Sequence, residues 1–257
     1  MDLNNWLTKI KAHPATLIVT TLTALFAFTA TITKQYETIQ GWYIDSYTSS
    51  NEYQMLDKIN VTLTRSTIIN TLGEPQIKKS IEKLGSTESF TEELYGFPKF
   101  YVQVIYDSNE EVIFYAVTSR LASFHPPLPC STSELGLGEQ TFHELNPDFV
   151  TDNLIYAYAT SKHYNYAESY YTGDSCKYHT YYFGYNDRTG ILYGDTQPTP
   201  LYMQGVDEDE VLSEFRNAAK PNLYAVLKVG VDLYEFLNPP WETEIGILFL
   251  DAENLPN

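Results

Sequence analysis

Residues 14–33 form a run of twenty positions without one charged side chain, and this run constrains the chain most strongly. As a helix, a run of this length extends about 30 Å at roughly 1.5 Å per residue, which matches the hydrocarbon core of a membrane. A helix also satisfies its own backbone hydrogen bonds, as lipid requires. We therefore expect a transmembrane helix at residues 14–33, preceded by a short tail at residues 1–13.

Two other interpretations of this run stay open: a cleaved signal peptide and a buried helix of a soluble protein. Seven threonines make the run only weakly hydrophobic, although a helical threonine hydroxyl can bond a carbonyl one turn back. Against a signal peptide, the run is longer than the usual 7–15 apolar residues, and no Ala-x-Ala cleavage site follows it.

Lysines near the ends of the run indicate its orientation. Lys9 and Lys11 precede it and Lys34 follows it, so the positive-inside rule favours a cytoplasmic N-terminus. We therefore expect a single-pass protein of the bacterial inner (cell) membrane, with a helical connector at residues 34–59. The large domain beyond it would lie outside the cytoplasm.

The charge balance narrows the class of partner. The chain carries 16 basic and 33 acidic residues, for a net charge of −17. Such a surface repels phosphate backbones, so nucleic acid is not an expected partner. A basic protein, a cation or a neutral sugar suits this field better, and acidity also keeps an exported domain soluble. The expected partners are the membrane and a protein or neutral ligand, with no oligomeric state indicated.

The chain has two cysteines, Cys130 and Cys176, both in the large domain. Outside the cytoplasm an even count favours one disulfide, whereas inside it two free thiols would be ordinary. A bond between these two cysteines is therefore expected only with the outside orientation.

Tyrosine is unusually frequent, with 22 residues, and together with phenylalanine and threonine it favours β-structure. Residues 64–72 have the pattern of a helix, with Thr64 as N-cap and Gly73 followed by Pro75 as the stop. Apolar and aromatic runs predict strands, the first two joined by a hairpin turn at residues 107–110. The further predicted elements are strands at 99–106, 112–118, 224–236 and 245–250 and a helix at 207–220.

These elements predict an α+β fold with a mostly antiparallel sheet after the membrane helix. Residues 125–129 (His-Pro-Pro-Leu-Pro) have the composition of a linker, because consecutive prolines break helices and central strands. Residues 137–140 (Leu-Gly-Glu-Gln) are similar to residues 72–75 (Leu-Gly-Glu-Pro), which suggests two related α+β units. The expected organisation is a first α+β unit at residues 60–124, a Pro-rich linker at 125–134 and a Tyr-rich α+β unit at 135–257.

The first unit resembles the SmpA/OmlA and β-lactamase-inhibitor-like group of bacterial envelope modules, in which a helix ends in Leu-Gly-x-Pro and leads to an antiparallel sheet. Here residues 68–75 (Ile-Ile-Asn-Thr-Leu-Gly-Glu-Pro) precede the runs at 100–106 and 112–117. The likeness extends over residues 60–120, and the whole chain is similar to uncharacterised single-pass bacterial membrane proteins. It implies a protein-binding module without catalytic residues. Those modules are usually lipoproteins, whereas a membrane helix is predicted here.

A Tyr-rich segment provides the candidate binding surface. Tyrosine offers a large contact area at low entropic cost, which suits a stacking platform for sugar or peptide. Alternate tyrosines that fill a sheet core would explain the same pattern. The residues of this candidate surface are Tyr164, Tyr166, Tyr170, Tyr171, Tyr178, Tyr181, Tyr182 and Tyr185.

No sequence motif indicates catalysis, a cofactor or a metal. His163, Asp174 and His179 lie near Cys176 without the spacing of a metal site or of a nucleophilic pair. His143-Glu144 lacks the second histidine of a zincin helix, and the acidic run at 207–210 lacks the alternating ligands of an EF-hand. We therefore expect a protein without catalytic residues, cofactor or metal.

The leading hypothesis is a membrane-anchored bacterial protein whose acidic extracytoplasmic domain binds a protein or ligand at the cell envelope. The alternative is a sensor or effector that faces the cytoplasm, with a transmembrane helix that oligomerises to act on the membrane. An enzyme that uses His179 or Asp174 is a more distant hypothesis.

Overall fold

The computed structural model describes residues 50–82, 89–129, 136–159, 164–171, 177–186, 208–235, 245–246 and 255. The chain separates into two compact units, Met1–Glu52 and Tyr53–Asn257, and nearly all described residues belong to the second. The predicted membrane helix at residues 14–33 lies outside the described residues. Within the described part, no helix is long and apolar enough to cross a membrane.

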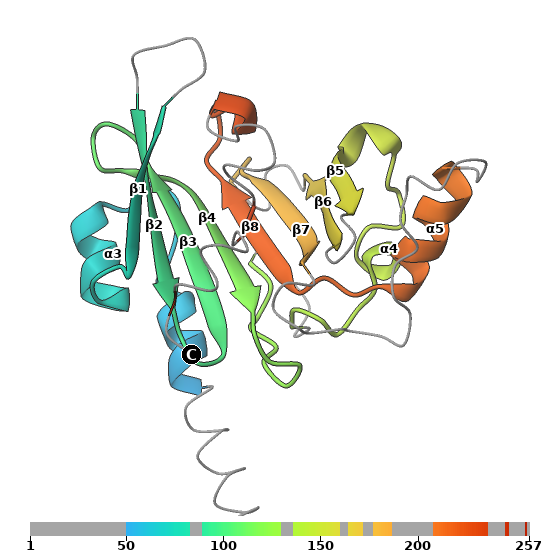
Figure 1. Cartoon of the computed structure of the whole chain (residues 1–257), viewed down its shortest axis with the longest axis horizontal. Coiled ribbons are helices and arrows are strands. Elements are labelled where there is room, and N and C mark those ends of the chain that lie inside the picture. The colour runs from blue at the N-terminus through green and yellow to red at the C-terminus, as the bar shows by residue number, and fades with distance from the viewer. Residues whose placement is uncertain are drawn as a thin grey trace, which may run out of the picture. The chain divides into compact units, whose positions relative to one another are not determined.

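The second unit is built on one eight-stranded sheet in which all neighbouring strands are antiparallel (Figure 1). From edge to edge the order is β1-β2-β3-β4-β8-β7-β6-β5. The predicted α+β class with a mostly antiparallel sheet is thus confirmed. The strands are β1 (Ile77–Glu82), β2 (Ser89–Gly96), β3 (Phe100–Tyr106), β4 (Val112–Ser119), β5 (Leu154–Ala159), β6 (Tyr164–Tyr170), β7 (Thr180–Asn186) and β8 (Leu223–Leu227).

Two four-stranded halves make up this sheet, and they meet where β4 pairs with β8. Each half runs in chain order from an outer strand to an inner one, β1 to β4 in the first and β5 to β8 in the second. At the junction, Tyr115 lies opposite Val226, and Val117 lies opposite Tyr224. We call this β4–β8 junction the seam.

One face of the sheet, the helix-covered face, packs against helices from both halves. Helix 50–56 contributes Leu56, and α3 (Arg65–Leu72) contributes Ile68. From the second half, α4 (Phe142–Leu145) contributes Phe142 and α5 (Glu208–Ala218) contributes Phe215. All four side chains belong to a single buried cluster, so the two halves share one core on this face.

Alternation along the strands assigns the remaining side chains to the opposite face. On β8, Tyr224 and Val226 join the helix-covered core, whereas Leu223 and Ala225 join a second cluster. Ile245 belongs to that second cluster, which therefore includes a residue from the C-terminal part of the chain. The short 3₁₀ helices η1 (Thr151–Asn153) and η4 (Leu233–Glu235) complete the described elements.

A buried carboxylate ties α3 to the first half of the sheet. Glu93 on β2 is 0% exposed, and Arg65 of α3 donates from Nε to its Oε1 at 2.6 Å. The hydroxyl of Tyr95, two residues along the same strand, donates to its Oε2 at 2.9 Å. The charge of Glu93 is thereby compensated by a cation and a neutral donor, as burial requires.

A second buried carboxylate plays the same part in the other half. Glu168 on β6 is 0% exposed, and Arg216 of α5 donates from Nε to its Oε2 at 2.8 Å. Tyr166, again two residues away on the same strand, donates its hydroxyl to that oxygen at 2.6 Å. Burial raises the pKa of Glu168, and the hydrogen bonds from Arg216 and Tyr166 oppose this shift. Arg216 also donates to the carbonyl of Asn146 at 2.8 Å, which links α5 to the end of α4.

The predicted helix at residues 64–72 is confirmed as α3, with Thr64 at the N-cap and Gly73, at a φ of 87°, just beyond its end. The predicted hairpin turn is confirmed by bonds from the amides of Asn109 and Glu111 to the carboxylate of Asp107. The similar motif at residues 137–140 occupies a different place, because it precedes α4 instead of ending a helix. The strand order of the two halves is therefore alike, but these two motifs are not equivalent in the fold.

Removal of the Arg216 charge should leave Glu168 buried and uncompensated. We expect Arg216→Met to lower the free energy of unfolding by about 3–5 kcal/mol, the usual cost of breaking a buried ion pair. A second substitution, Glu168→Gln, removes the uncompensated charge and leaves an acceptor for the Tyr166 hydroxyl. The double variant should therefore be more stable than Arg216→Met alone. Urea unfolding measures both. A loss below about 1 kcal/mol for Arg216→Met would show that solvent reaches the pair.

Candidate functional site

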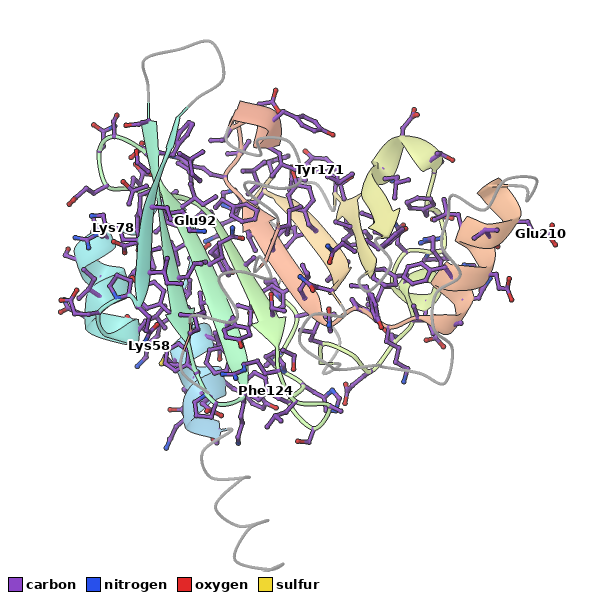
Figure 2. All side chains as sticks on the ribbon, in the orientation of Figure 1. Lys58, Lys78, Glu92, Phe124, Tyr171 and Glu210 are labelled. Atoms are coloured by element: carbon purple, nitrogen blue, oxygen red, sulfur yellow. The ribbon has the colours of Figure 1, made fainter. Side chains whose placement is uncertain are left out.

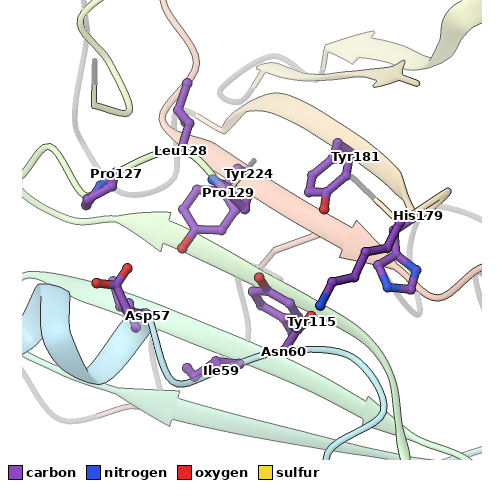
Figure 3. Close-up of a pocket in the computed structure, with 12 residues that line it drawn as sticks. Asp57, Ile59, Asn60, Tyr115, Pro127, Leu128, Pro129, His179, Tyr181 and Tyr224 are labelled. Carbon is purple, nitrogen blue, oxygen red and sulfur yellow. The ribbon is translucent and has the colours of Figure 1, made fainter. Parts of the chain in front are cut away.

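A pocket of about 290 Å³ opens on the helix-covered face directly over the seam (Figure 3). Its lining comes from both halves of the sheet, from the end of helix 50–56 and from the Pro-rich segment. The lining residues are Leu56, Asp57, Ile59, Asn60, Tyr115, Pro127, Leu128, Pro129, Lys177, His179, Tyr181 and Tyr224. The volume is close to the lower limit of about 300 Å³ for small-molecule sites.

Three tyrosines form the sheet side of the pocket. Tyr115 comes from β4, Tyr224 from β8 and Tyr181 from β7, three strands that are adjacent in the sheet. The rings of Tyr115 and Tyr224 meet edge to face, with centroids 6.4 Å apart. Figure 3 shows the hydroxyls of all three at the pocket. The bodies of these side chains are buried, so each presents mainly its polar tip.

Tyr224 is the most informative of the three. It is only 3% exposed, yet no described side chain hydrogen-bonds its hydroxyl. Burial raises the pKa of Tyr224 well above its ordinary value, and the charges of Tyr115 and Asp57 act in the same direction. The phenol is therefore neutral at physiological pH and offers one donor and one acceptor to the pocket.

The Pro-rich segment forms another wall of the pocket and packs against the rest of the domain. Leu128 is 6% exposed, and the amide of Leu137 donates to the carbonyl of Pro126 at 2.9 Å. The hydroxyl of Tyr53 accepts a bond from the amide of His125, 72 positions along the chain. Residues 125–129, which the sequence suggests as a linker, thus hold one wall of the pocket in place.

His179 is positioned by a backbone bond. The amide of Val229 donates to its Nδ1 at 3.1 Å, so Nδ1 is unprotonated and the ring proton sits on Nε2. Burial lowers the pKa of His179, and the positive charges of Lys177 and Lys228 lower it further. The imidazole is accordingly neutral at pH 7 and can donate one hydrogen bond from Nε2.

Lys177 and Tyr178, just before β7, both adopt left-handed backbone conformations, with φ of 57° and 62°. Residues with a Cβ are uncommon there, at a cost of roughly 1–2 kcal/mol each. Lys177 lines the pocket, while Tyr178 is 50% exposed. The strained turn therefore lies at the edge of the pocket, as is frequent for backbone outliers at functional sites.

The structure divides the Tyr-rich candidate surface between core and exterior. Four of its members are buried in the two clusters: Tyr166, Tyr181, Tyr182 and Tyr185. Tyr170 is half-buried against Phe183, with ring centroids 5.8 Å apart. Tyr171 follows β6 and is 62% exposed (Figure 2), and Tyr178 is exposed near the same end of the sheet. Tyr164 begins β6, and its side chain lies outside the described part.

The described tyrosines of β6 and β7 therefore do not form one continuous exposed surface. Alternation sends Tyr166, Tyr181 and Tyr185 to the helix-covered face, where helices bury them. Of the predicted tyrosines whose side chains the structure describes, Tyr181 alone lines the pocket.

Other candidates from the sequence lie elsewhere. Cys130, Cys176, His163 and Asp174 fall outside the described residues, so the expected disulfide does as well. Glu144 closes a capping box at the start of α4, where it accepts a bond from the amide of Thr141 at 2.8 Å. Among the described residues, no three His, Cys, Asp or Glu side chains are grouped as a metal would require.

Sequence reasoning did not single out Tyr115, Tyr224, Asp57 or Asn60. Tyr115 and Tyr224 each lie in a strand whose other residues are mostly apolar, so the sequence pattern does not distinguish them from core residues. A hydroxyl within a fully buried strand needs a partner or a cavity, and this requirement is the signal that could have found them.

Comparisons of the chain with protein-family models, with curated proteins and with solved structures gave no match. The chemistry that this site can support follows from its own side chains. They supply neutral donors and acceptors on aromatic surface, one carboxylate and one ammonium group, which suits binding of a small polar molecule.

The state of His179 can be measured directly. We expect its imidazole to titrate below the ordinary pKa of 6.5, because burial and two lysines disfavour the charged ring. The unfolded chain then binds the proton first as the pH falls through 6.5, so the free energy of unfolding should decrease below that pH. NMR titration of the ring and urea unfolding across pH 5–8 would test this.

His179→Asn provides the matched control, because its side-chain oxygen can replace Nδ1 as acceptor for the Val229 amide but does not titrate. Its unfolding free energy should lack the His179 contribution to the pH dependence. A pKa for His179 at or above 6.5 would contradict the lowering expected from burial and the two lysines.

Proposed function

We propose that this chain is a non-catalytic, membrane-anchored binding protein of bacteria, whose α+β domain holds a small polar ligand in the pocket over the seam. The anchor would be residues 14–33, and the lysine distribution favours an acidic domain outside the cytoplasm. The expected setting is the cell envelope.

The observation that carries this proposal is the Tyr224 hydroxyl. A phenol that is 97% withdrawn from solvent normally has a hydrogen-bond partner inside the protein. Here it faces a pocket that also receives the tips of Tyr115 and Tyr181 (Figure 3). A ligand that accepts or donates hydrogen bonds at this place would satisfy it.

The same groups favour binding over catalysis. The phenol of Tyr224, whose pKa is raised by burial, exchanges protons poorly with a substrate at pH 7, because a good general acid or base titrates near the working pH. Among the residues that the structure describes, the pocket lining includes no serine, cysteine or threonine that could serve as a nucleophile.

The proposal includes a relation between the two halves of the domain, which the sequence suggests as two α+β units. Support comes from their shared strand order and from the buried glutamates Glu93 on β2 and Glu168 on β6, each bonded to an arginine and a tyrosine. A ligand site over the seam would then join two similar halves, as binding sites between domains commonly do.

A thermal-shift assay of the full-length chain in detergent would test the site. The probes are glycine, L-leucine, D-glucose and adenosine, each at millimolar concentration. A ligand at 100 times its Kd stabilises a protein by about 2.7 kcal/mol, so binding of one class should raise the melting temperature by several degrees. Tyr224→Phe should abolish the shift, whereas Tyr171→Phe, at an exposed tyrosine, should retain it. An equal shift in both variants would place the binding elsewhere, and no shift with any probe would count against a small-ligand site.

The orientation can be tested separately, by fusion of alkaline phosphatase or green fluorescent protein after Asn257 in a bacterial host. We expect phosphatase activity without fluorescence, because the enzyme folds only outside the cytoplasm and the fluorescent protein only inside. Fluorescence without phosphatase activity would contradict the envelope location and favour a sensor that faces the cytoplasm.

A further inference from the structure

One end of the pocket is acidic. Asp57 lines the pocket and is exposed, and its negative charge contributes to the raised pKa of Tyr224. Figure 3 shows its carboxylate beside the pocket on the side of the Tyr224 hydroxyl. No described cation forms an ion pair with Asp57, so its charge is available to a ligand.

The other end is basic. Lys177 lines the pocket together with His179, and its charge acts on that imidazole. The nearby Lys228 is already paired with Glu111, with its Nζ 2.5 Å from a carboxylate oxygen. Lys177 has no such partner among the described residues. It is therefore the ammonium group that this end can offer to a ligand.

Neutral hydrogen-bonding groups connect the two ends. The three tyrosine hydroxyls and the Nε2–H of His179 belong to the same lining, and His179 is on the far side of the pocket from Asp57 (Figure 3). Leu56, Ile59 and Leu128 add apolar surface. A ligand could thus place two opposite charges at the ends and an apolar group against the middle.

The two charges favour one ligand class over the others. An anion would meet Asp57 and the field of a chain with a net charge of −17, and a cation would meet Lys177. A neutral sugar could bond the tyrosines but would form an ion pair with neither Asp57 nor Lys177. A net-neutral molecule with separated charges compensates both ends at once.

We propose that the pocket binds a zwitterionic ligand of the amino-acid class, with its ammonium group at Asp57 and its carboxylate at Lys177. The inference rests on the proposed function and specifies the ligand of the same pocket. The pocket volume of about 290 Å³ favours a free amino acid or a very short peptide over a larger molecule.

Matched derivatives can test the two charges one at a time. Glycine, L-leucine and L-phenylalanine are titrated into the full-length chain in detergent by calorimetry, followed by the N-acetyl and methyl ester forms of the tightest binder. Each derivative removes one charge, so each should bind about 10-fold more weakly or worse, since a hydrogen bond to a charged group contributes about 1.5–3 kcal/mol.

Two variants assign each charge to its residue. Asp57→Asn should weaken the free amino acid but leave the N-acetyl form little affected, and Lys177→Gln should do the same for the methyl ester. Both residues are exposed, so the melting temperatures should stay close to that of the parent chain. Lys58→Gln, at an exposed neighbour outside the pocket, is the control and should bind as the parent does.

The outcomes separate this inference from the function on which it rests. Two outcomes would contradict a zwitterionic ligand but leave the pocket as a binding site. In the first, the amino acid and both derivatives bind equally well. In the second, D-glucose binds and Tyr224→Phe abolishes this binding, while no amino acid binds. If no amino acid, glucose or adenosine binds in a way that depends on Tyr224, both the zwitterionic ligand and the proposed binding function would be contradicted.

Discussion

The pairing of β4 with β8 is the interaction on which the rest of this domain depends. Five ladder positions join the strands, and every residue of β8 is buried. Since β8 follows β7 only after α5, this pairing brings a strand from late in the chain to the centre of the sheet. It also brings Tyr115 and Tyr224 together, so the pocket exists only where the two halves have merged.

Local patterns were sufficient to predict several elements. A glycine stop and a capping position define α3, a short polar run between two apolar ones defines the β3–β4 hairpin, and acidic and apolar spacing defines α5. These signals act within a few residues, and the structure confirms them. β8 ends at Leu227, well short of the predicted strand, because Lys228–Gly230 turn and Gly230 takes a φ of 81°. The turn interrupts an otherwise continuous apolar pattern.

Features that depend on residues far apart in the chain could not be predicted from the sequence. β2 carries Glu92 and Glu93 side by side, which argues against a buried strand, yet both are buried in it (Glu92 is labelled in Figure 2). Glu93 is paired with Arg65 and Glu92 accepts from Gln103, 28 and 11 positions away in the chain. The pocket also depends on distant partners, because its tyrosines come from three strands. In the sequence they resemble core residues, and only the pairing of β4 with β8 brings them together. Its charged ends, Asp57 and Lys177, lie 120 positions apart.

A crystal structure of the full-length chain with the tightest-binding amino acid would test the central claim most directly. We predict electron density for the ligand between Tyr115, Tyr181 and Tyr224, with its ammonium group toward Asp57 and its carboxylate toward Lys177. Ligand bound on another surface, with the seam pocket unchanged, would contradict the assignment of this pocket as the binding site.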